Sequence, residues 1–254
     1  MMQTSPAIEI ADLRVSFPDR RAPGGRIVAL DGITLSVPSG AIFGFLGPNG
    51  AGKSTTIQAL LGFVAPTGGC VRLLGRDIRS AEARRRIGYL PEPPAAYPFL
   101  TAREWVETCA RLSGLPRREA HSRADLLLGQ FDLGGAADRR IGGFSRGMLQ
   151  RLGLAQALVH DPDLLILDEP TSGMDPIGRH DIRRRRAVRR ARGKRVFFSS
   201  HELSEVELIC DRVAILNRGR VAFEGAPAER LRAGESLEQL FLRTVCPGPE
   251  GGTP

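Results

Sequence analysis

The most specific chemistry in this 254-residue chain lies in one glycine-rich segment. It has the spacing G-x-x-x-x-G-K-S and consists of Gly47, Pro48, Asn49, Gly50, Ala51, Gly52, Lys53 and Ser54. Glycines let backbone N–H groups curl around a phosphate. Lys53 is suited to reach the β- and γ-phosphates of a nucleotide, and the Ser54 hydroxyl is suited to ligate Mg²⁺. The segment therefore predicts a phosphate-binding loop rather than an ordinary glycine turn, and we count Thr55 among the nucleotide-binding residues.

A pair of carboxylates, Asp168 and Glu169, stands directly after the apolar run 164–167. Asp168 is suited to hold Mg²⁺, directly or through water. Glu169 is suited to polarise an attacking water molecule. An apolar strand that ends in Asp-Glu is weak evidence by itself, because such a pair is more often a plain strand terminus. Downstream of a phosphate-binding loop, the pair indicates nucleotide hydrolysis.

The composition limits the other possibilities. Hydrophobic residues make up 42% of the chain, which is enough for a sizeable core. The four cysteines form no CxxC pair and no zinc-spaced Cys/His cluster, so we expect free thiols. We expect no signal peptide, and the longest apolar runs are far shorter than the roughly 20 residues needed to span a bilayer. A role at a membrane would therefore require another polypeptide to form the channel.

A dense basic stretch at residues 183–192 contributes to the net charge of +8. Such a stretch could bind a phosphate backbone or an anionic lipid. We favour a solvated helix face in an arginine-rich chain, because no aromatic residue lies within the stretch to stack on bases. We therefore expect no nucleic-acid partner.

Strands and helices must position the residues of the glycine-rich loop and the carboxylate pair. Residues 41–46 form a short, continuous apolar run, typical of a buried strand, that leads directly into the glycine-rich loop. The helical spacing of apolar residues follows at 53–61. Further strands are predicted at 8–17, 33–37, 69–74, 87–90, 164–167, 195–199, 213–216 and 221–224, with a hairpin across 217–220.

The middle of the chain is predicted to be helical. Thr101 and Glu104 form a capping box at the start of one helix. Further helices are predicted at 116–130, 146–159, 176–192 and 202–210. The pattern predicts an α/β fold: a P-loop NTPase core with a mostly parallel sheet, an N-terminal antiparallel β subdomain and an inserted helical subdomain at about residues 92–150. We place these parts in one domain over residues 1–246, followed by a flexible tail at 247–254.

The segment Phe144, Ser145, Arg146, Gly147 and Met148 stands immediately before the helix predicted at 146–159. In this place it resembles the signature Leu-Ser-Gly-Gly-Gln of the ATP-binding cassette (ABC) family. The chain keeps the serine and the second glycine of that signature and differs at the other three positions. An aromatic-Ser-basic-Gly-Met variant is similar to one exporter branch of the family.

This resemblance extends over roughly residues 8 to 242, and it implies that a second subunit completes the nucleotide site. Ser145, Arg146, Gly147 and Met148 would face the γ-phosphate held by the other subunit, with Ser145 and Gly147 in direct contact. An N-cap by Ser145 is compatible with this role. The family's D-loop matches residues 171–175, which implies that Asp175 contacts the other subunit.

Three further roles follow from the resemblance. His201 ends a predicted strand where the family has a histidine that senses the γ-phosphate and helps to hold the water. Glu92 occupies the position of the family's Q-loop glutamine, where a carboxylate could ligate Mg²⁺; a solvated loop residue is the alternative. Phe17 occupies the place of an aromatic residue that stacks on adenine, and a core phenylalanine is the alternative. Val28 could also touch the base.

The resemblance implies an ATP-binding and ATP-hydrolysing subunit of an ABC transporter with ATP and Mg²⁺ as cofactors. Two copies, or this chain and a homologous ATPase subunit, would dimerise around ATP and drive a separate transmembrane permease, with export favoured over import. The subunit would be peripheral, at the cytoplasmic face of the cell membrane. The surface of Tyr97, Phe99 and Trp105 would meet the permease, although burial in the core explains Trp105 equally well.

Two other classes of protein remain as alternatives. One is a cassette ATPase that acts on the ribosome or on DNA. Fewer than a hundred residues separate Lys53 from Ser145, with no heptad run, which is unlike the DNA-acting class. The other is a binding module that does not hydrolyse nucleotide, against which the presence of Glu169 and His201 argues.

Overall fold

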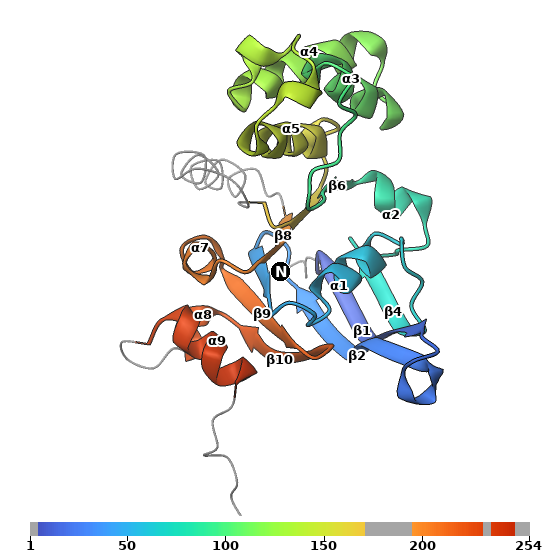
Figure 1. Ribbon diagram of the computed structural model, residues 1–254, viewed down its shortest axis with the longest axis vertical. Coiled ribbons are helices and arrows are strands. Elements are labelled where there is room, and N and C mark those ends of the chain that lie inside the picture. The colour runs from blue at the N-terminus through green and yellow to red at the C-terminus, as the bar shows by residue number, and fades with distance from the viewer. Residues whose placement is uncertain (1–4, 171–194, 231–234, 247–254) are drawn as a thin grey trace, which may run out of the picture. The chain divides into compact units, whose positions relative to one another are not determined.

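The computed structural model describes residues 5–170, 195–230 and 235–246. The chain divides into two compact units, of which unit 1 comprises Met1–Arg84 and Arg195–Pro254 and unit 2 comprises Arg85–Lys194. Figure 1 labels the elements of both units.

Unit 1 contains an antiparallel sheet in the order β2-β1-β4-β5. Its strands are β1 (Ile8–Pro18), β2 (Arg26–Val37), β4 (Gly68–Leu73) and β5 (Arg76–Asp77). The predicted strand at 33–37 is only the end of β2, which begins at Arg26. The first residues of β2 pair with the end of β1, Phe17 opposite Ile27, and their side chains are exposed, so hydrophobic burial does not mark them in the sequence.

Unit 1 also contains the strands that hold the phosphate-binding loop, in the order β10-β9-β3-β8. They are β3 (Ile42–Leu46), β8 (Arg195–Ser200), β9 (Arg212–Asn217) and β10 (Arg220–Gly225). β3 runs parallel to β8 and β9, whereas β10 closes an antiparallel hairpin with β9. Every residue of β3 is buried, and Phe43 and Phe45 pack on Phe197 of β8, with ring centroids 6.0 and 5.2 Å apart. This core fixes the strand from which the loop begins.

The described helices of unit 1 are α1 (Lys53–Leu60), α7 (Leu203–Ile209), α8 (Pro227–Arg230) and α9 (Leu237–Val245), with a short 3₁₀ turn at Pro23–Gly25. Among them, α1 and α7 confirm the helices predicted at 53–61 and 202–210, whereas α8 and α9 were not predicted. α2 (Ala81–Arg85) ends at the boundary between the units. The helix predicted at 176–192 lies outside the described residues.

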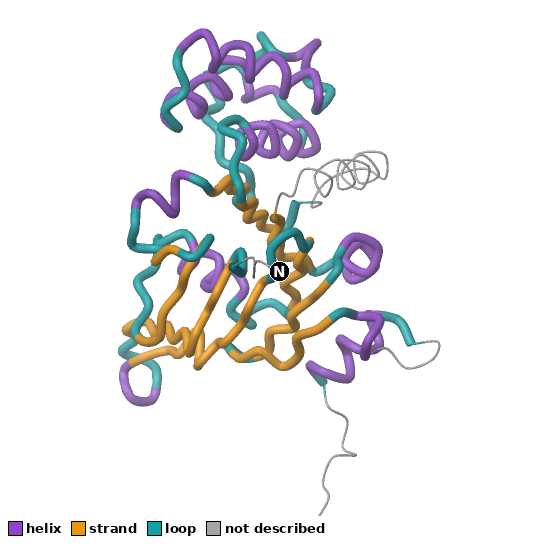
Figure 2. The backbone as a smooth tube through the Cα atoms, turned by 180° about the vertical axis from the view of Figure 1, so that it is seen from behind, coloured by secondary structure: helices purple, strands orange, loops and turns teal. Residues whose placement is uncertain are grey.

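In its described residues, 85–170, unit 2 combines two parallel strands with three packed helices. The strands are β6 (Ile87–Leu90) and β7 (Leu164–Asp168), and the helices are α3 (Ala102–Leu112), α4 (Arg117–Gln130) and α5 (Arg146–Leu158), with 3₁₀ turns at Gly134–Ala136 and Ile141–Gly143. Figure 2 shows the three helices gathered into one group. The predicted capping box is confirmed, since the Thr101 hydroxyl accepts from the Glu104 amide while the Glu104 carboxylate accepts from the Thr101 amide.

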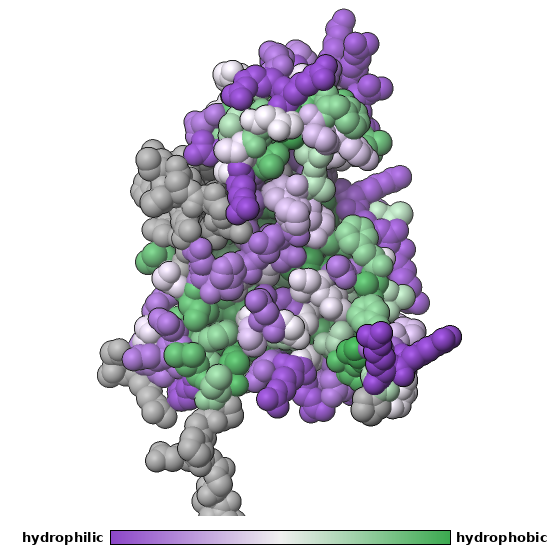
Figure 3. All heavy atoms as spheres, viewed as in Figure 1, coloured by the Kyte–Doolittle hydropathy of each residue, from purple (hydrophilic) through white to green (hydrophobic). Residues whose placement is uncertain are grey.

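The α/β fold predicted from the sequence is confirmed, with antiparallel strands early in the chain and parallel strands around the loop. The limits of the helical subdomain at 92–150 and of the single domain at 1–246 stay predictions. Figure 3 shows hydrophobic and hydrophilic residues interleaved on the face in view. Among the described residues, no helix is long and apolar enough to cross a bilayer.

Candidate nucleotide site

The phosphate-binding loop joins a buried strand to a helix, as the sequence predicted. β3 ends at Leu46, the loop begins at Gly47, and α1 starts at Lys53. The Lys53 ammonium group donates to the carbonyl of Gly47 at 2.6 Å and to that of Pro48 at 3.3 Å. The lysine is thus held over the loop, and its carbonyl partners can be exchanged for phosphate oxygens of higher charge.

Tight backbone contacts shape the loop from behind. Gly52 has a φ of +107°, and a Cβ atom there would lie 2.9 Å from the Ala29 carbonyl oxygen of β2. Gly219, in the turn between β9 and β10, has a φ of +75°, and its Cβ would lie 2.7 Å from the same oxygen. The Gly219 amide donates to the Ala51 carbonyl at 2.9 Å, while its own carbonyl accepts from the Asp31 amide at 2.8 Å. The β9–β10 turn is therefore the rear support of the loop.

Ion pairs hold that turn against the antiparallel sheet. Arg220 contacts the Asp31 carboxylate at 2.5 Å, and Arg14 contacts it from the other side at 2.7 Å. The hydrogen bond from Arg220 is the main reason that the pKa of Asp31 is lowered. Because Asp31 also donates its amide to Gly219, the ion pairs and the rear support of the loop meet at one residue.

His201 lies close to the phosphate-binding loop along the sheet. Leu46 of β3 is paired with Ser200 of β8, and the two strands are parallel. Gly47 and His201 are the next residues of these neighbouring strands, so the loop and the histidine leave the sheet side by side. The Ser200 hydroxyl accepts from the Glu202 amide at 3.0 Å and turns the chain after His201. Unit 1 thus combines the loop with the predicted γ-phosphate sensor.

Phe17 lies at the far end of the β1–β2 hairpin and is 40% exposed. The alternative of a core phenylalanine is therefore wrong. Ile27 and Val28 of β2 are also exposed, so the hairpin end presents three apolar side chains to solvent. An aromatic ring among aliphatic side chains is suited to a flat base.

The predicted carboxylates lie at the end of β7 in unit 2. Asp168 and Glu169 are 8% and 6% exposed, respectively. Glu169 has a φ of +48°, which is uncommon for a residue other than glycine. Its backbone carbonyl accepts a hydrogen bond of 3.1 Å from the side-chain amide of Gln150 on α5. Burial, with a smaller contribution from the nearby Asp168 charge, raises the pKa of Tyr89 to about 12, so this phenol keeps its proton at neutral pH.

Glu92 follows the strand next to the carboxylates. β6 and β7 are parallel, with Leu90 opposite Leu167, so the chains after both strands leave the same edge of unit 2. Glu92 is exposed, and the peptide bond between it and Pro93 is cis. Unit 2 thus brings Glu92 and the carboxylate pair to one edge.

The signature segment forms the start of α5. Ser145 is its N-cap, and the serine hydroxyl accepts from the Met148 amide at 3.3 Å, which confirms the predicted cap. Ser145 and Arg146 are exposed, whereas Gly147 and Met148 are half-buried. The exposed start of the helix is accessible to a second molecule. Asp175 lies outside the described residues.

An aromatic group lies between β6 and α3 of unit 2. Tyr97 stacks on Phe99 at 5.5 Å and meets the edge of Trp105 at 5.4 Å between ring centroids. Tyr97 and Phe99 are 57% and 65% exposed. The Trp105 indole nitrogen is buried without a hydrogen-bond partner.

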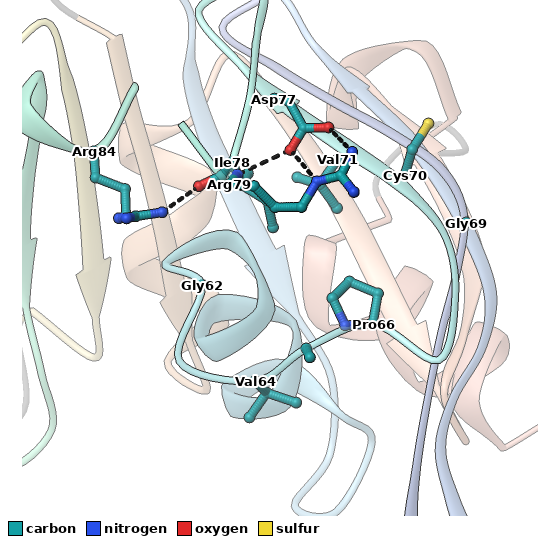
Figure 4. Close-up of a pocket in the computed structure, with 11 residues that line it drawn as sticks. Gly62, Val64, Pro66, Gly69, Cys70, Val71, Asp77, Ile78, Arg79 and Arg84 are labelled. Atoms are coloured by element: carbon teal, nitrogen blue, oxygen red, sulfur yellow. Dashed lines mark hydrogen bonds and ion pairs between the residues drawn. The ribbon is translucent and has the colours of Figure 1, made fainter. Parts of the chain in front are cut away.

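A separate pocket of about 310 Å³ lies in unit 1, past the C-terminal end of α1 and therefore away from the loop at its N-terminus (Figure 4). Arg79 pairs with Asp77 on its wall, and Arg84 donates to the Ile78 carbonyl. These engaged arginines do not indicate a second phosphate site. Across the described ranges, no cluster of three or more His, Cys, Asp or Glu residues has the arrangement of a metal site.

Sequence reasoning missed two functional supports, Gly219 and Gln150. The Asn-Arg-Gly-Arg turn at 217–220 was a signal for a hairpin but not for its contact with the loop. Gln150 had no signal, since a glutamine in a helix is ordinarily exposed.

Comparisons with known proteins agree with this geometry. The family model described as "ABC transporter" matches residues 30–172, more than half of the chain. The chain belongs to the ABC transporter family. It is an ATP-binding subunit of that family and an ATPase.

Two curated relatives extend the family match. An uncharacterized ABC transporter ATP-binding protein of Nostoc sp. (strain PCC 7120) is 42% identical over 90% of this chain and 69% of its own length. A Nod factor export ATP-binding protein I of Burkholderia lata is 40% identical over 80% of this chain and 67% of its own length. These relatives do not favour the alternative of a cassette that acts on the ribosome or DNA.

Solved structures show the same fold. The structure of an ATP-binding subunit of an ABC transporter matches with a TM-score of 0.83 at 32% identity and covers 94% of this chain and 99% of its own. A dimeric structure of a bacterial ABC transporter cassette matches with a TM-score of 0.79 at 25% identity, covering 86% of this chain and 98% of its own.

Proposed function

We propose that this ABC subunit binds Mg²⁺-ATP, dimerises around it and uses its hydrolysis to drive a separate transmembrane permease that exports a substrate. The observation that carries the proposal is the parallel pairing of β3 with β8, which places His201 beside the start of the phosphate-binding loop. A loop with a neighbouring histidine is suited to hold the γ-phosphate and respond to its loss.

The binding roles follow from the loop. The backbone from Gly47 to Ser54, continued by Thr55, surrounds the phosphates, and Lys53 exchanges its loop carbonyls for phosphate oxygens. Phe17 stacks on the adenine, supported by its exposure at the end of the hairpin. The loop thus binds the phosphate end of the nucleotide, and Phe17 binds its base.

The catalytic roles belong to Glu169 and His201. Glu169 accepts a proton from the attacking water, and His201 orients the water and the γ-phosphate. The position of Glu169 at the end of β7 and its low exposure support this role, because the carboxylate is held in one place. Lys53 stabilises the charge that develops on the phosphate oxygens.

Mg²⁺ is the cation that suits the oxygen ligands of this chain. Ser54 and Asp168 would hold it, with Glu92 as a further candidate, and a bound Mg²⁺ would neutralise phosphate charge. Asp168 stands at the buried end of β7, and a carboxylate oxygen is a suitable ligand for Mg²⁺.

The second subunit is a copy of this chain or a homologous ATPase. Its Ser145–Met148 segment would close the site over the γ-phosphate, together with the D-loop aspartate, Asp175. The exposed Ser145 and Arg146, and the dimeric form of one similar cassette, support this arrangement.

The permease contact is proposed for the exposed aromatic group of Tyr97 and Phe99. Exposed aromatic side chains are enriched at interfaces between proteins. The names of the Nod factor export relatives favour export. The chain would then be peripheral at the cytoplasmic face of the membrane.

The dimer can be tested with Glu169→Gln, which keeps the shape of the base but removes its proton affinity. Sedimentation should show a dimer with Mg²⁺-ATP and a monomer with ADP, because ATP is bound and not cleaved. The double variant with Lys53→Ala is the control and should stay monomeric. A Glu169→Gln protein that stays monomeric with saturating ATP would contradict the proposed closure.

Coupling to transport is tested by isolating the full chain from membranes and identifying the protein bound to it. A transmembrane permease is the expected partner. Recovery with ribosomes or DNA instead would overturn the transport role while leaving the ATPase intact.

A further inference from the structure

Gln150 has a buried side chain that none of the roles above uses. It lies in the second turn of α5, is 3% exposed, and is one of few buried polar side chains among the described residues. A buried amide needs hydrogen-bond partners, because leaving it unpaired is costly. Its Nε2 atom donates to the backbone carbonyl oxygen of Glu169 at 3.1 Å. The hydrogen bond of this amide is therefore made to the backbone of Glu169, the proposed base.

The backbone at Glu169 requires such support. A φ of +48° brings the Cβ atom close to the carbonyl oxygen, so that residues other than glycine adopt it only where their surroundings enforce it. Glu169 also precedes Pro170, whose ring restricts the preceding residue. Since φ and ψ at Glu169 set the direction of its Cα–Cβ bond, a hydrogen bond to its carbonyl helps to fix where the carboxylate points.

The donor stands on a firmly seated helix. Ser145 caps the start of α5. At Gly153, a Cβ atom would lie 2.4 Å from Leu90 and 3.2 Å from Pro94, so the helix packs against the end of β6 without room for a methyl group. Gln150 lies between these two anchors and cannot shift independently of them. The signature segment forms the start of α5, and Gln150 of the same helix holds the backbone of Glu169. Helix α5 therefore supports both the signature segment and the proposed base of one chain.

We propose that Gln150 is a positioning residue for hydrolysis: its amide holds the left-handed backbone of Glu169 and so aims the base, linking it to the helix that carries the signature segment. The inference rests on the proposed role of Glu169. It predicts that loss of the amide slows cleavage of bound ATP while ATP binding, which depends on the loop in unit 1, is preserved.

The test compares Gln150→Met, which keeps the length of the side chain but removes the donor, with Gln156→Met as the matched control on the same helix. Gln156 is half-buried, and no hydrogen bond from its side chain to Glu169 is found. ATP affinity and single-turnover hydrolysis are measured on the full chain, with melting curves to verify folding. Gln150→Met should slow cleavage by about tenfold to a hundredfold, since a small misplacement of a catalytic group is costly, with ATP affinity unchanged. Gln156→Met should change neither.

A double-variant cycle separates positioning from general damage. In a Glu169→Gln background, Gln150→Met should cause no further loss of turnover, because there is no base left to aim. If Gln150→Met does not fold, Gln150→Asn, which keeps the amide but shortens its reach, should show the same selective slowing. Native cleavage by a folded Gln150→Met protein, or equal losses in both backgrounds, would overturn the inference. Loss of turnover in Glu169→Gln in the same experiment would show that the proposed catalytic role of Glu169 still holds.

Discussion

The phosphate-binding loop of unit 1 and the carboxylate edge of unit 2 are supported by different kinds of contact. Behind the loop, main chain meets main chain: Gly219 bonds to Ala51, and Ala29 leaves no room for a Cβ at Gly52. At the carboxylate edge, a side-chain amide from Gln150 holds the main chain of Glu169.

Because of this difference, we expect the two regions to be sensitive to different kinds of substitution. Main-chain contacts are disturbed by an added methyl group, and they shape the surface that binds phosphate. The side-chain contact is lost by removing an amide, and we propose that it orients a group that acts only in the cleavage step. Changes in the first region should alter affinity, and changes in the second should alter the rate of cleavage.

The largest effect is expected for Lys53→Ala. Its ammonium group is already placed over the loop by the carbonyls of Gly47 and Pro48, so little reorganisation opposes phosphate binding. Removing the charge should weaken ATP binding by about a hundredfold or more, as for other partly buried charge partners. Calorimetric titration would measure this, with a melting curve as the folding control. If the ATP affinity of Lys53→Ala stayed within about twofold of the native value, the proposal that this loop binds ATP would be contradicted.

A smaller effect is expected for Gly219→Ala, which introduces a Cβ 2.7 Å from the Ala29 carbonyl oxygen. The turn must shift, and the loop with it, so ATP affinity should fall by about tenfold. Gly75→Ala is the matched control, because Gly75 has a φ of +77° and open space around it. Equal affinities of the two variants would show that the β9–β10 turn does not support the loop.

Phe17→Ala should weaken ATP binding by about fivefold, which is the loss expected for one stacking contact on a base. Phe63→Ala serves as the control, since Phe63 is an exposed aromatic residue of the same unit. Titration with ATP and with inorganic triphosphate separates the two ends of the ligand. Only ATP should be affected, and an equal loss for triphosphate would rule out stacking on the base.

The smallest effect is expected for Glu92→Gln, at the carboxylate edge. Glu92 is exposed, so its contribution to cation binding is screened by water. The Mg²⁺ concentration for the half-maximal ATPase rate should rise by about threefold. Asp168→Asn provides the comparison, because the loss of a buried ligand should raise this Mg²⁺ concentration further. An unchanged Mg²⁺ dependence in Glu92→Gln would end the metal role of this residue.

The sequence predicted the parts of the fold that have local signals. Continuous apolar runs marked β3 and β7, and the capping box marked the start of α3, because burial and capping impose residue types at fixed spacing. The beginning of β2 was missed because Arg26 and Ile27 are exposed, and their pairing with β1 depends on the hairpin rather than on burial.

The residues of the candidate site also fall into those that a local sequence pattern reveals and those that it does not. Lys53, Asp168 and Glu169 stand in recognisable motifs, because direct chemistry restricts their identity. Gly219 and Gln150 act across long distances in the sequence, through contacts that only the folded chain creates. No local pattern could reveal them.

The most direct test of this account measures the ATP dissociation constant and the single-turnover cleavage rate of Gly219→Ala and Glu169→Gln in one set of conditions. We expect opposite patterns from the two variants. Gly219→Ala should bind ATP about tenfold more weakly and cleave what is bound at close to the native rate. Glu169→Gln should bind ATP normally and cleave it about a hundredfold or more slowly. If both variants changed the same quantity, the division between a main-chain-supported binding loop and a side-chain-supported catalytic edge would be contradicted.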